Sequence, residues 1–333
     1  MGWASRILTQ AELQPSLNAS EPESLRQQVS ALIAQQQATW PMLQAATAGL
    51  AQVTDQPLDV HGSRVIAQFN PARLVSTGAK VDAASIRQRP CFLCADHLPL
   101  EEQGIEFGKD FVILCNPFPV LRDHLVITHR AHTPQAIAGN FAALLDLAQA
   151  LGNGWFALYN GPACGASAPD HLHFQACDSS LLPIVQDLEQ REKKVVSSQA
   201  GLEVFTLPGY RVNLLVARGS DHAALNEWFA QMVSHLAEVT GASAEPMLNL
   251  VVLSDGMNWT VCVFPRSKHR PACYFAEGEA KLTISPAGID LAGVLVVPEA
   301  AHFARINETD VEQIYAEVTL DDLRLAELIR RIA

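Results

Sequence analysis

The sequence predicts an α+β fold in which an antiparallel sheet with flanking helices is built from two related halves behind an N-terminal helical segment. Residues 8–52 carry apolar side chains at helical spacing. After them the chain changes to short β-type runs bounded by Asn, Pro and Gly. The order of runs and helical stretches then recurs more loosely in the second half. This recurrence predicts a duplicated α+β unit.

In the first half, the pattern predicts several strands and one main helix. In the N-terminal helical stretch, Pro41 marks a break or a restart. Strand-like runs begin at "VHGSRVIAQFNP", and "FVILCNPFPVLRDHLVIT" holds two of them around a turn with prolines, which is typical of a hairpin or meander. We expect a helix from about Pro134 to Leu151, then strands at "GWFALYNG" and "HLHFQACD" and a helix at "LLPIVQDLEQREKK".

The second half repeats this plan without the histidine pair. A helix is expected near 221–239. It is followed by a hairpin with a basic turn in "MLNLVVLSDG" and "WTVCVFPRSKHRP", a Ser/Pro/Gly loop entering a strand in "SPAGIDLAGVLVVP", and closing helices at 300–332. We therefore divide the chain into an N-terminal helical segment (1–55), a first half with the candidate chemistry (56–200) and a degenerate second half (201–333).

Composition narrows the class of protein. With 333 residues, of which 49% are hydrophobic and 17% charged, the chain can bury one large core or two ordinary ones. A formal charge of −12 argues against nucleic-acid partners, which require a basic face. No apolar run approaches the roughly 20 residues needed to span a membrane. The start lacks the basic and apolar regions of a signal peptide, and the seven cysteines are an odd count, so we expect a cytoplasmic protein without membrane contact or a disulfide scaffold.

The stretch "GASAPDHLHFQA" places His171, His173 and Gln175 on alternate positions. On a strand, these three side chains would point to the same face. They could be ordinary polar residues of a strand, or one histidine could be a nucleophile held by its neighbours. The preceding run of small residues favours the second interpretation, because it lets backbone N–H groups approach an anion closely. A neutral imidazole facing bound phosphate is a plausible nucleophile.

The pair Cys91 and Cys94 in "RPCFLCADH" has three interpretations. It could be redox-active, but no βαβ setting accompanies it. It could be half of a zinc site, for which His132 and His171 are candidate further ligands. It could also be two buried cysteines on either side of Phe92.

Two cationic stretches could hold phosphate. "VFPRSKHRP" places Arg266, Lys268, His269 and Arg270 within five positions, and arginine binds phosphate through its planar fork. In "AQFNPARLVSTGAK", Arg73 follows a strand-like run. The alternatives are a solvated turn in the first stretch and a helix cap in the second.

Taken together, these residues resemble the transferase branch of the histidine-triad (HIT-like) superfamily, which includes galactose-1-phosphate uridylyltransferases, diadenosine tetraphosphate phosphorylases and GDP-hexose phosphorylases. The resemblance covers about residues 60–180 well and 245–300 weakly, and rests on His-x-His-x-Gln at residues 171–175. It implies a sheet of two fused HIT-like halves. It also implies that His173 attacks a nucleotide and carries the nucleoside monophosphate, and that Gln175 hydrogen-bonds the transferred phosphoryl group.

The same resemblance implies the surrounding site. "CFLCA" is similar to the zinc loop of the uridylyltransferases, which implies a structural Zn²⁺ bound by Cys91, Cys94, His132 and His171. Three segments, "LCNPF", "YNGPACGAS" and "NPAR", imply a set of substrate-binding residues: Asn116, Phe118, Asn160, Gly165, Ser167 and Arg73. The sequence departs from the family at Asp170, an extra residue before the histidine pair, which puts the alignment of Ser167 in question. The second half has no histidine counterpart to the second metal site of some uridylyltransferases.

The function implied is a nucleotidylyltransferase or phosphorylase. It would move a nucleoside monophosphate between a nucleotide sugar or dinucleoside polyphosphate and a phosphate-bearing acceptor, such as inorganic phosphate or a sugar phosphate. The second half could close over the site and contribute to a homodimer. The alternatives are a dinucleotide hydrolase of the same fold, a zinc-stabilised nucleotide-binding protein without turnover, and a thiol oxidoreductase based on the two cysteines.

Overall fold

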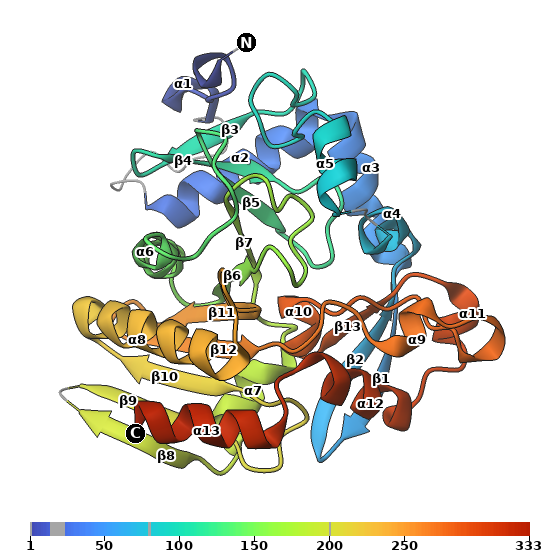
Figure 1. Cartoon of the computed structure of the whole chain (residues 1–333). Coiled ribbons are helices and arrows are strands. Elements are labelled where there is room, and N and C mark those ends of the chain that lie inside the picture. Colours follow the sequence, from blue (N-terminus) through green and yellow to red (C-terminus); the bar gives the residue numbers. More distant parts are fainter. Residues whose placement is uncertain (1, 14–23, 79–80, 200) are drawn as a thin grey trace.

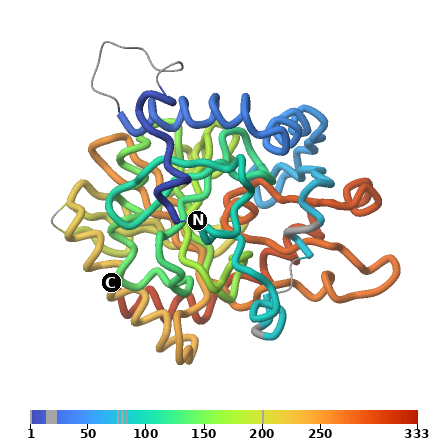
Figure 2. Tube along the Cα trace, turned by 90° about the horizontal axis from the view of Figure 1, so that it is seen from above, coloured from blue at the N-terminus to red at the C-terminus, as the bar shows by residue number. Residues whose placement is uncertain are grey.

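The computed structural model describes residues 2–13, 24–78, 81–199 and 201–333. The N-terminal stretch forms α1 (Gln10–Leu13), α2 (Leu25–Thr39) and α3 (Pro41–Gly49). Ser24 caps α2 and Gln27 closes the capping box. Pro41 is the first residue of α3, so the proline restarts the helix as expected. Figure 2 shows these helices in blue along one side of the molecule. The part of the helical prediction that falls on residues 14–23 lies outside the described residues.

A ten-stranded antiparallel sheet organises the rest of the molecule (Figure 1). The first half supplies β3 (Gly104–Phe107), β4 (Phe111–Cys115), β5 (Leu125–His129), α6 (Phe141–Leu151), β6 (Trp155–Asn160) and β7 (His173–Asp178). The second half supplies β8 (Lys194–Gln199), β9 (Leu202–Thr206), β10 (Leu215–Gly219), α8 (His222–Thr240), β11 (Leu248–Ser254) and β12 (Trp259–Pro265). Outside this sheet lie β1 (Thr54–Val60), β2 (Ser63–Phe69), β13 (Val294–Val297), α4 (Leu74–Thr77), α5 (Ala83–Gln88), α7 (Pro183–Gln190), α9 (Ala272–Phe275), α10 (Gly288–Leu291), α11 (Ala300–Phe303), α12 (Glu308–Val318) and α13 (Asp322–Ile332).

The two halves of the sheet repeat one topology. The strand order is β3-β4-β5-β7-β6-β11-β12-β10-β9-β8, so each half contributes five strands and the order reverses at the β6–β11 junction. Along the chain, each half runs through three strands, a helix and two strands. The predicted α+β architecture of two fused HIT-like halves is therefore confirmed. The second repeat begins with β8, which lies within the 56–200 range that we assigned to the first half. The second half of the sheet therefore starts before residue 201.

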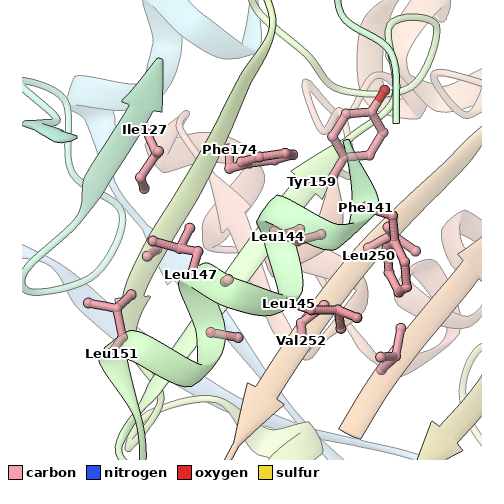
Figure 3. Packing of buried hydrophobic residues seen from close by; sticks show 14 of the residues in the cluster. Ile127, Phe141, Leu144, Leu145, Leu147, Leu151, Tyr159, Phe174, Leu250 and Val252 are labelled. Carbon is pink, nitrogen blue, oxygen red and sulfur yellow. The ribbon is translucent and has the colours of Figure 1, made fainter. Parts of the chain in front are cut away.

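One face of the sheet forms the main apolar core. Leu144, Leu147 and Leu151 of α6 are buried against the sheet, and Figure 3 shows them near Ile127 and Phe174. Apolar side chains of α2, α8 and α13 belong to the same cluster. The three- and four-residue spacing of the leucines places them on one side of α6, which accounts for its orientation.

The opposite face is covered over the second half of the sheet and is hollow over the first half. A second apolar cluster joins that face to the small sheet β1-β2-β13 and to α7, α10 and α12. In Figure 1 these elements lie to the right of the central strands, whereas α6 and α8 lie to the left. Over β4, β5 and β7 the same face lines a cavity.

The predicted helix from Pro134 to Leu151 begins at Phe141 instead. The preceding residues bind other parts of the molecule: Gln135 bonds to the backbone of β6 and β7, and the Ile137 N–H donates to Glu245. These tertiary hydrogen bonds hold the segment outside the helix.

Within the described residues, no helix is long and apolar enough to cross a membrane.

Candidate functional site

A cavity of about 700 Å³ opens on the hollow face of the first half. Its floor is a row of neighbouring side chains across four strands, because Gln175 is paired with Leu158 on one side and Val126 on the other, and Val126 is paired with Leu114. All four line the cavity. Residues from α3, α4, α5, the 89–102 loop and the 269–296 segment form its walls.

His173 is the first residue of β7 and lines this cavity while being 5% exposed. Its Nδ1 lies 2.8 Å from the backbone oxygen of His171. A carbonyl only accepts, so Nδ1 carries the proton and Nε2 keeps its lone pair. Burial lowers the pKa of His173 to about 4, so the ring is neutral at neutral pH. The side chain of Gln135 holds the backbone of His173 through both its N–H and its carbonyl.

Gln175 follows on the same face of β7, and His124 orients its amide. The Nδ1 of His124 accepts the Val120 N–H at 3.1 Å, so its Nε2 carries the proton. That Nε2–H donates to the Gln175 Oε1 at 2.7 Å. The amide nitrogen of Gln175 is thereby left as the donor available to a bound group. Burial and the charge of Arg73 lower the pKa of His124 to about 3, which keeps it neutral.

His171 does not belong to β7 and does not share the cavity face, contrary to the alternation that we expected. It precedes the strand, is fully buried, and its Nε2 lies 2.7 Å from the backbone oxygen of His129. This hydrogen bond places the proton on Nε2 and turns the Nδ1 lone pair toward Cys91 and Cys94. The chain leaves the strand here because residues 161–171 form a loop of tight turns.

Four side chains form a cluster that could hold a metal ion. Their ligand atoms, on Cys91, Cys94, His132 and His171, all lie within 4.8 Å of one another. The two histidine Nδ1 atoms are 3.3 Å apart, and three of the four sulfur-to-nitrogen distances are 3.3 to 3.5 Å. A tetrahedral ion with ordinary zinc bond lengths requires about 3.3 Å between two nitrogens and about 3.6 Å between nitrogen and sulfur. The geometry and the donor set therefore fit such an ion.

The extra residue Asp170 is accommodated by an ion pair. Its Oδ1 accepts from Arg89 at 2.7 Å, and Arg89 also reaches the Ser167 backbone oxygen at 3.5 Å. Ser167 still lines the cavity together with Gly165. Among the described residues, none accepts a hydrogen bond from the N–H of Gly165 or Ser167. Gly165 has a φ of 120°, and a Cβ there would lie 2.7 Å from the Ala287 Cβ, so only glycine fits.

Asn160 ends β6 at the same place. Its Oδ1 accepts from Asn249 at 2.8 Å and from the Gly288 N–H at 3.0 Å. These two bonds fix the amide, so its nitrogen is available as a donor on the cavity wall.

The cationic residues divide into two groups. Arg73 and Arg270 line the cavity, and each is tied to the backbone of a neighbouring segment: Arg73 to the Phe118 oxygen at 2.5 Å and Arg270 to the Thr77 oxygen at 2.9 Å. Our expectation fails for Arg266 and Lys268, which do not line the cavity. Arg266 is 1% exposed and its guanidinium donates to Asn249 and to backbone oxygens, whereas Lys268 pairs with Glu317 at 3.4 Å.

Apolar side chains also line the cavity. Phe118 is one of them, and Asn116 holds its turn by accepting the Phe118 N–H at 2.9 Å. Phe92 and Met42 are two others, both partly exposed, and the Arg89 guanidinium lies 4.8 Å from the centroid of the Phe92 ring.

Sequence reasoning missed the residues that orient the site. His124, Gln135 and Asn249 each act through a hydrogen bond to a residue of the site that is at least 38 positions away along the chain. No local motif marks them. Their signal is only that each is a buried polar residue on or beside an apolar run.

Comparison with known proteins agrees with this architecture. Residues 32–178 match a family model described as a domain of unknown function (DUF4922), and residues 186–333 match the GDPGP1-like C-terminal domain. No curated protein matches the sequence significantly.

Solved structures of one enzyme share the fold. The crystal structure of yeast Ap4A phosphorylase Apa2 aligns with a TM-score of 0.56 and 14% identity over 84% of this chain and 93% of that chain. The complex of the same enzyme with AMP aligns with a TM-score of 0.53 and 15% identity over 84% of this chain and 95% of that chain. The complex with Ap4A aligns with a TM-score of 0.53 and 14% identity over 84% of this chain and 96% of that chain. Residues 186–333 are thus similar to the GDPGP1-like C-terminal domain, and the chain shares its fold with the phosphorylase.

Proposed function

We propose that this protein is a nucleotidyltransferase or phosphorylase that transfers a nucleoside monophosphate through a covalent bond to His173. The donor would be a nucleotide sugar or a dinucleoside polyphosphate, and the acceptor would be inorganic phosphate or a sugar phosphate. One observation carries the proposal: the His171 carbonyl leaves the Nε2 lone pair of a neutral His173 free beside a cavity of about 700 Å³. The shared fold with an enzyme solved with AMP and Ap4A supports nucleotide substrates.

Two displacements complete the reaction. In the first, the Nε2 of His173 attacks the α-phosphorus, and the bond from phosphorus to the bridging oxygen breaks, so that oxygen leaves with the electron pair. In the second, an oxygen of the acceptor phosphate attacks the same phosphorus, and Nε2 leaves with the electrons of the P–N bond. Nδ1 keeps its proton throughout, and the His171 carbonyl stabilises the positive charge on the ring in the intermediate.

Several hydrogen-bond donors would surround the phosphoryl group. Gln175, held by His124, and Asn160 line the cavity from two neighbouring strands, and their amide nitrogens would donate to it. The N–H groups of Gly165 and Ser167 are available from the adjoining loop. Donors that are already oriented stabilise developing charge without reorganising, which is where we expect most of the rate enhancement to arise. Arg73 and Arg270 would bind the phosphates that are not transferred.

Cys91, Cys94, His132 and His171 would hold Zn²⁺. With four protein ligands the ion would be structural and would fix the position of His171. Because the backbone oxygen of His171 binds the Nδ1 of His173, the metal loop would act on the nucleophile through that one residue.

The test is the mass of the covalent intermediate. Purified protein is mixed with a UDP-, ADP- or GDP-sugar or with diadenosine tetraphosphate. The reaction is quenched in alkali, because P–N bonds are acid-labile, and the mass of the intact protein is measured by mass spectrometry. We expect a gain of one nucleoside monophosphate with one of these donors. His173→Ala should gain nothing, while the exposed His61→Ala should behave as the unaltered protein.

The same assay separates the rivals. An adduct in His173→Ala would overturn the role of that residue. Binding of nucleotide without any adduct or turnover would identify a non-catalytic protein, and turnover with water as the sole acceptor would identify a hydrolase.

A further inference from the structure

The N-terminal segment, residues 2–9, lies beside the cavity. Ile7 forms a parallel bridge with Gly104, the first residue of the edge strand β3. Ile7 and Trp3 also pack against a small apolar cluster that contains Leu98 and Leu114. Leu114 belongs to the floor of the cavity as well. A segment that is part of neither half of the duplicated sheet therefore adjoins the candidate site.

Arg6 of this segment is buried and binds the backbone of one loop. It is 4% exposed. An arginine keeps its charge in a protein, and burying that charge is costly unless acceptors surround it. Residues 95–102 supply acceptors, and they form turns with no helix or strand of their own, so their carbonyls need donors. The guanidinium donates to the backbone oxygens of Ala95, Leu98, Pro99, Leu100 and Glu102.

The end of this loop is held a second time, from α2. Gln36 is fully buried, and its Oε1 accepts the Gln103 N–H at 3.0 Å. Arg6 and Gln36 both precede the first strand of the chain. The path of residues 95–103 thus depends on two side chains from outside the duplicated sheet.

The loop forms a wall of the cavity. From Gln175, the sheet passes through β5 and β4 to reach β3, which the loop enters at Gly104. At ~4.8 Å between neighbouring strands, this end of the wall is about 14 Å from Gln175. Asn160 ends β6, on the other side of β7. The wall therefore lies away from the amides that we assign to the phosphoryl group. Its residues that line the cavity are His97, Pro99 and Glu102.

We propose that Arg6 is a positioning residue for substrate binding, which holds the 95–102 wall in the shape that receives the nucleotide beyond its phosphates. This inference rests on the proposed function, in which those phosphates lie beside His173. A wall that is already ordered costs less on binding, so its loss should weaken affinity. The residues that orient His173 come from other segments, so the bound substrate should still react at the same rate.

Equilibrium binding tests the proposal. Calorimetry measures the Kd of ADP, GDP, UDP and inorganic pyrophosphate for the full chain and for Arg6→Met, which keeps an apolar stem and removes the donors. We expect the nucleotide that binds most tightly to lose about tenfold or more in affinity, since several hydrogen bonds from a charged group are removed. Pyrophosphate has no nucleoside, so its Kd should stay within about twofold. The rate of adduct formation at saturating donor and the metal content should not change.

Arg26→Met is the matched control, because the exposed Arg26 also donates to a backbone oxygen, that of Asn153 at 3.0 Å. It should keep every Kd. Gln36→Leu reaches the loop independently of Arg6 and should show the same selective loss, which keeps the proposal open to test if Arg6→Met does not fold.

Three results would overturn the proposal. They are an unchanged nucleotide Kd in Arg6→Met or, if that variant does not fold, in Gln36→Leu; an equal loss of affinity for pyrophosphate; and a lower metal content in Arg6→Met, which would place the action of Arg6 on the metal loop.

This proposal and the proposed function fail separately. A selective loss of nucleotide affinity in a protein that forms no adduct would leave the role of Arg6 standing and remove the transfer mechanism. An adduct on His173 together with unchanged Kd values in both loop variants would do the reverse.

Discussion

At the scale of single residues, backbone and side-chain acceptors decide which atoms can react. One carbonyl places the proton of His173 on Nδ1, and another places the proton of His171 on Nε2. His173 is thus a candidate nucleophile, whereas His171, two residues earlier, is a candidate metal ligand. Gln175 is oriented by a donor instead, the Nε2–H of His124.

His124→Phe should slow the transfer without weakening substrate binding. The change frees the Gln175 amide to rotate, and the loss of about 1.4 kcal/mol corresponds to a roughly tenfold lower rate of adduct formation. Rapid-quench kinetics measures the rate. Adding Gln175→Ala should cost less in this background than in the unaltered protein, because both changes remove one interaction.

His222→Phe is the control for that experiment, since His222 lies on α8 and pairs with Asp146 away from the cavity. Fully additive losses in the double variant would contradict the positioning role of His124.

At the scale of elements, the loop that joins β6 to β7 connects the cavity to the cluster of possible metal ligands. It brings Gly165 and Ser167 to the cavity and ends at His171, which meets the cysteines of the 91–94 loop. The strands themselves were predictable from their apolar runs. The position of His171 just outside β7 was not, because it depends on contacts with residues that precede it by about 80 positions.

Removal of the metal should lower both stability and activity. We expect one Zn²⁺ per chain by elemental analysis, and a lower Tm after treatment with a chelator. Cys91→Ser should reproduce this loss and slow adduct formation by about 10²-fold, because small displacements of a nucleophile have effects of that size.

Cys273→Ser changes a half-buried thiol that is not part of the cluster, and it should retain the metal and the rate. Full activity of a Cys91→Ser protein that contains no zinc would refute the link from metal to nucleophile.

At the scale of the whole molecule, the second half completes the site of the first. The junction pairs β6 with β11, where Asn160 and Asn249 are direct neighbours. Arg266 donates to the Asn249 Oδ1 at 2.5 Å and to four backbone oxygens. We expected this residue to bind phosphate, but it holds Asn249, which in turn donates to Asn160.

Asn249→Ala should reduce both folding stability and transfer. It removes partners from Asn160 and Arg266 in the core, which should lower the free energy of unfolding by about 1–3 kcal/mol. Because the Asn160 amide is no longer fixed, adduct formation should also slow. Chemical denaturation and rapid-quench kinetics measure the two effects.

Asn213→Ala is the matched control, because Asn213 also makes two hydrogen bonds within the second half, to the Leu320 oxygen and to Asp322. It should lower stability with an unchanged rate. Equal effects of the two variants on the rate would contradict a specific role for Asn249.

The sequence by itself determined the main helices, many of the strands, the repetition and the His-x-His-x-Gln motif, because apolar periodicity and local spacing are written in consecutive residues. Only the tertiary structure decided which polar side chains share the cavity. It removed Arg266 and Lys268, and it added His124. The physical reason is that burial and hydrogen-bond satisfaction depend on neighbours from distant strands. Spacing along the chain therefore indicates which residues could act, and the fold determines which of them face the same space.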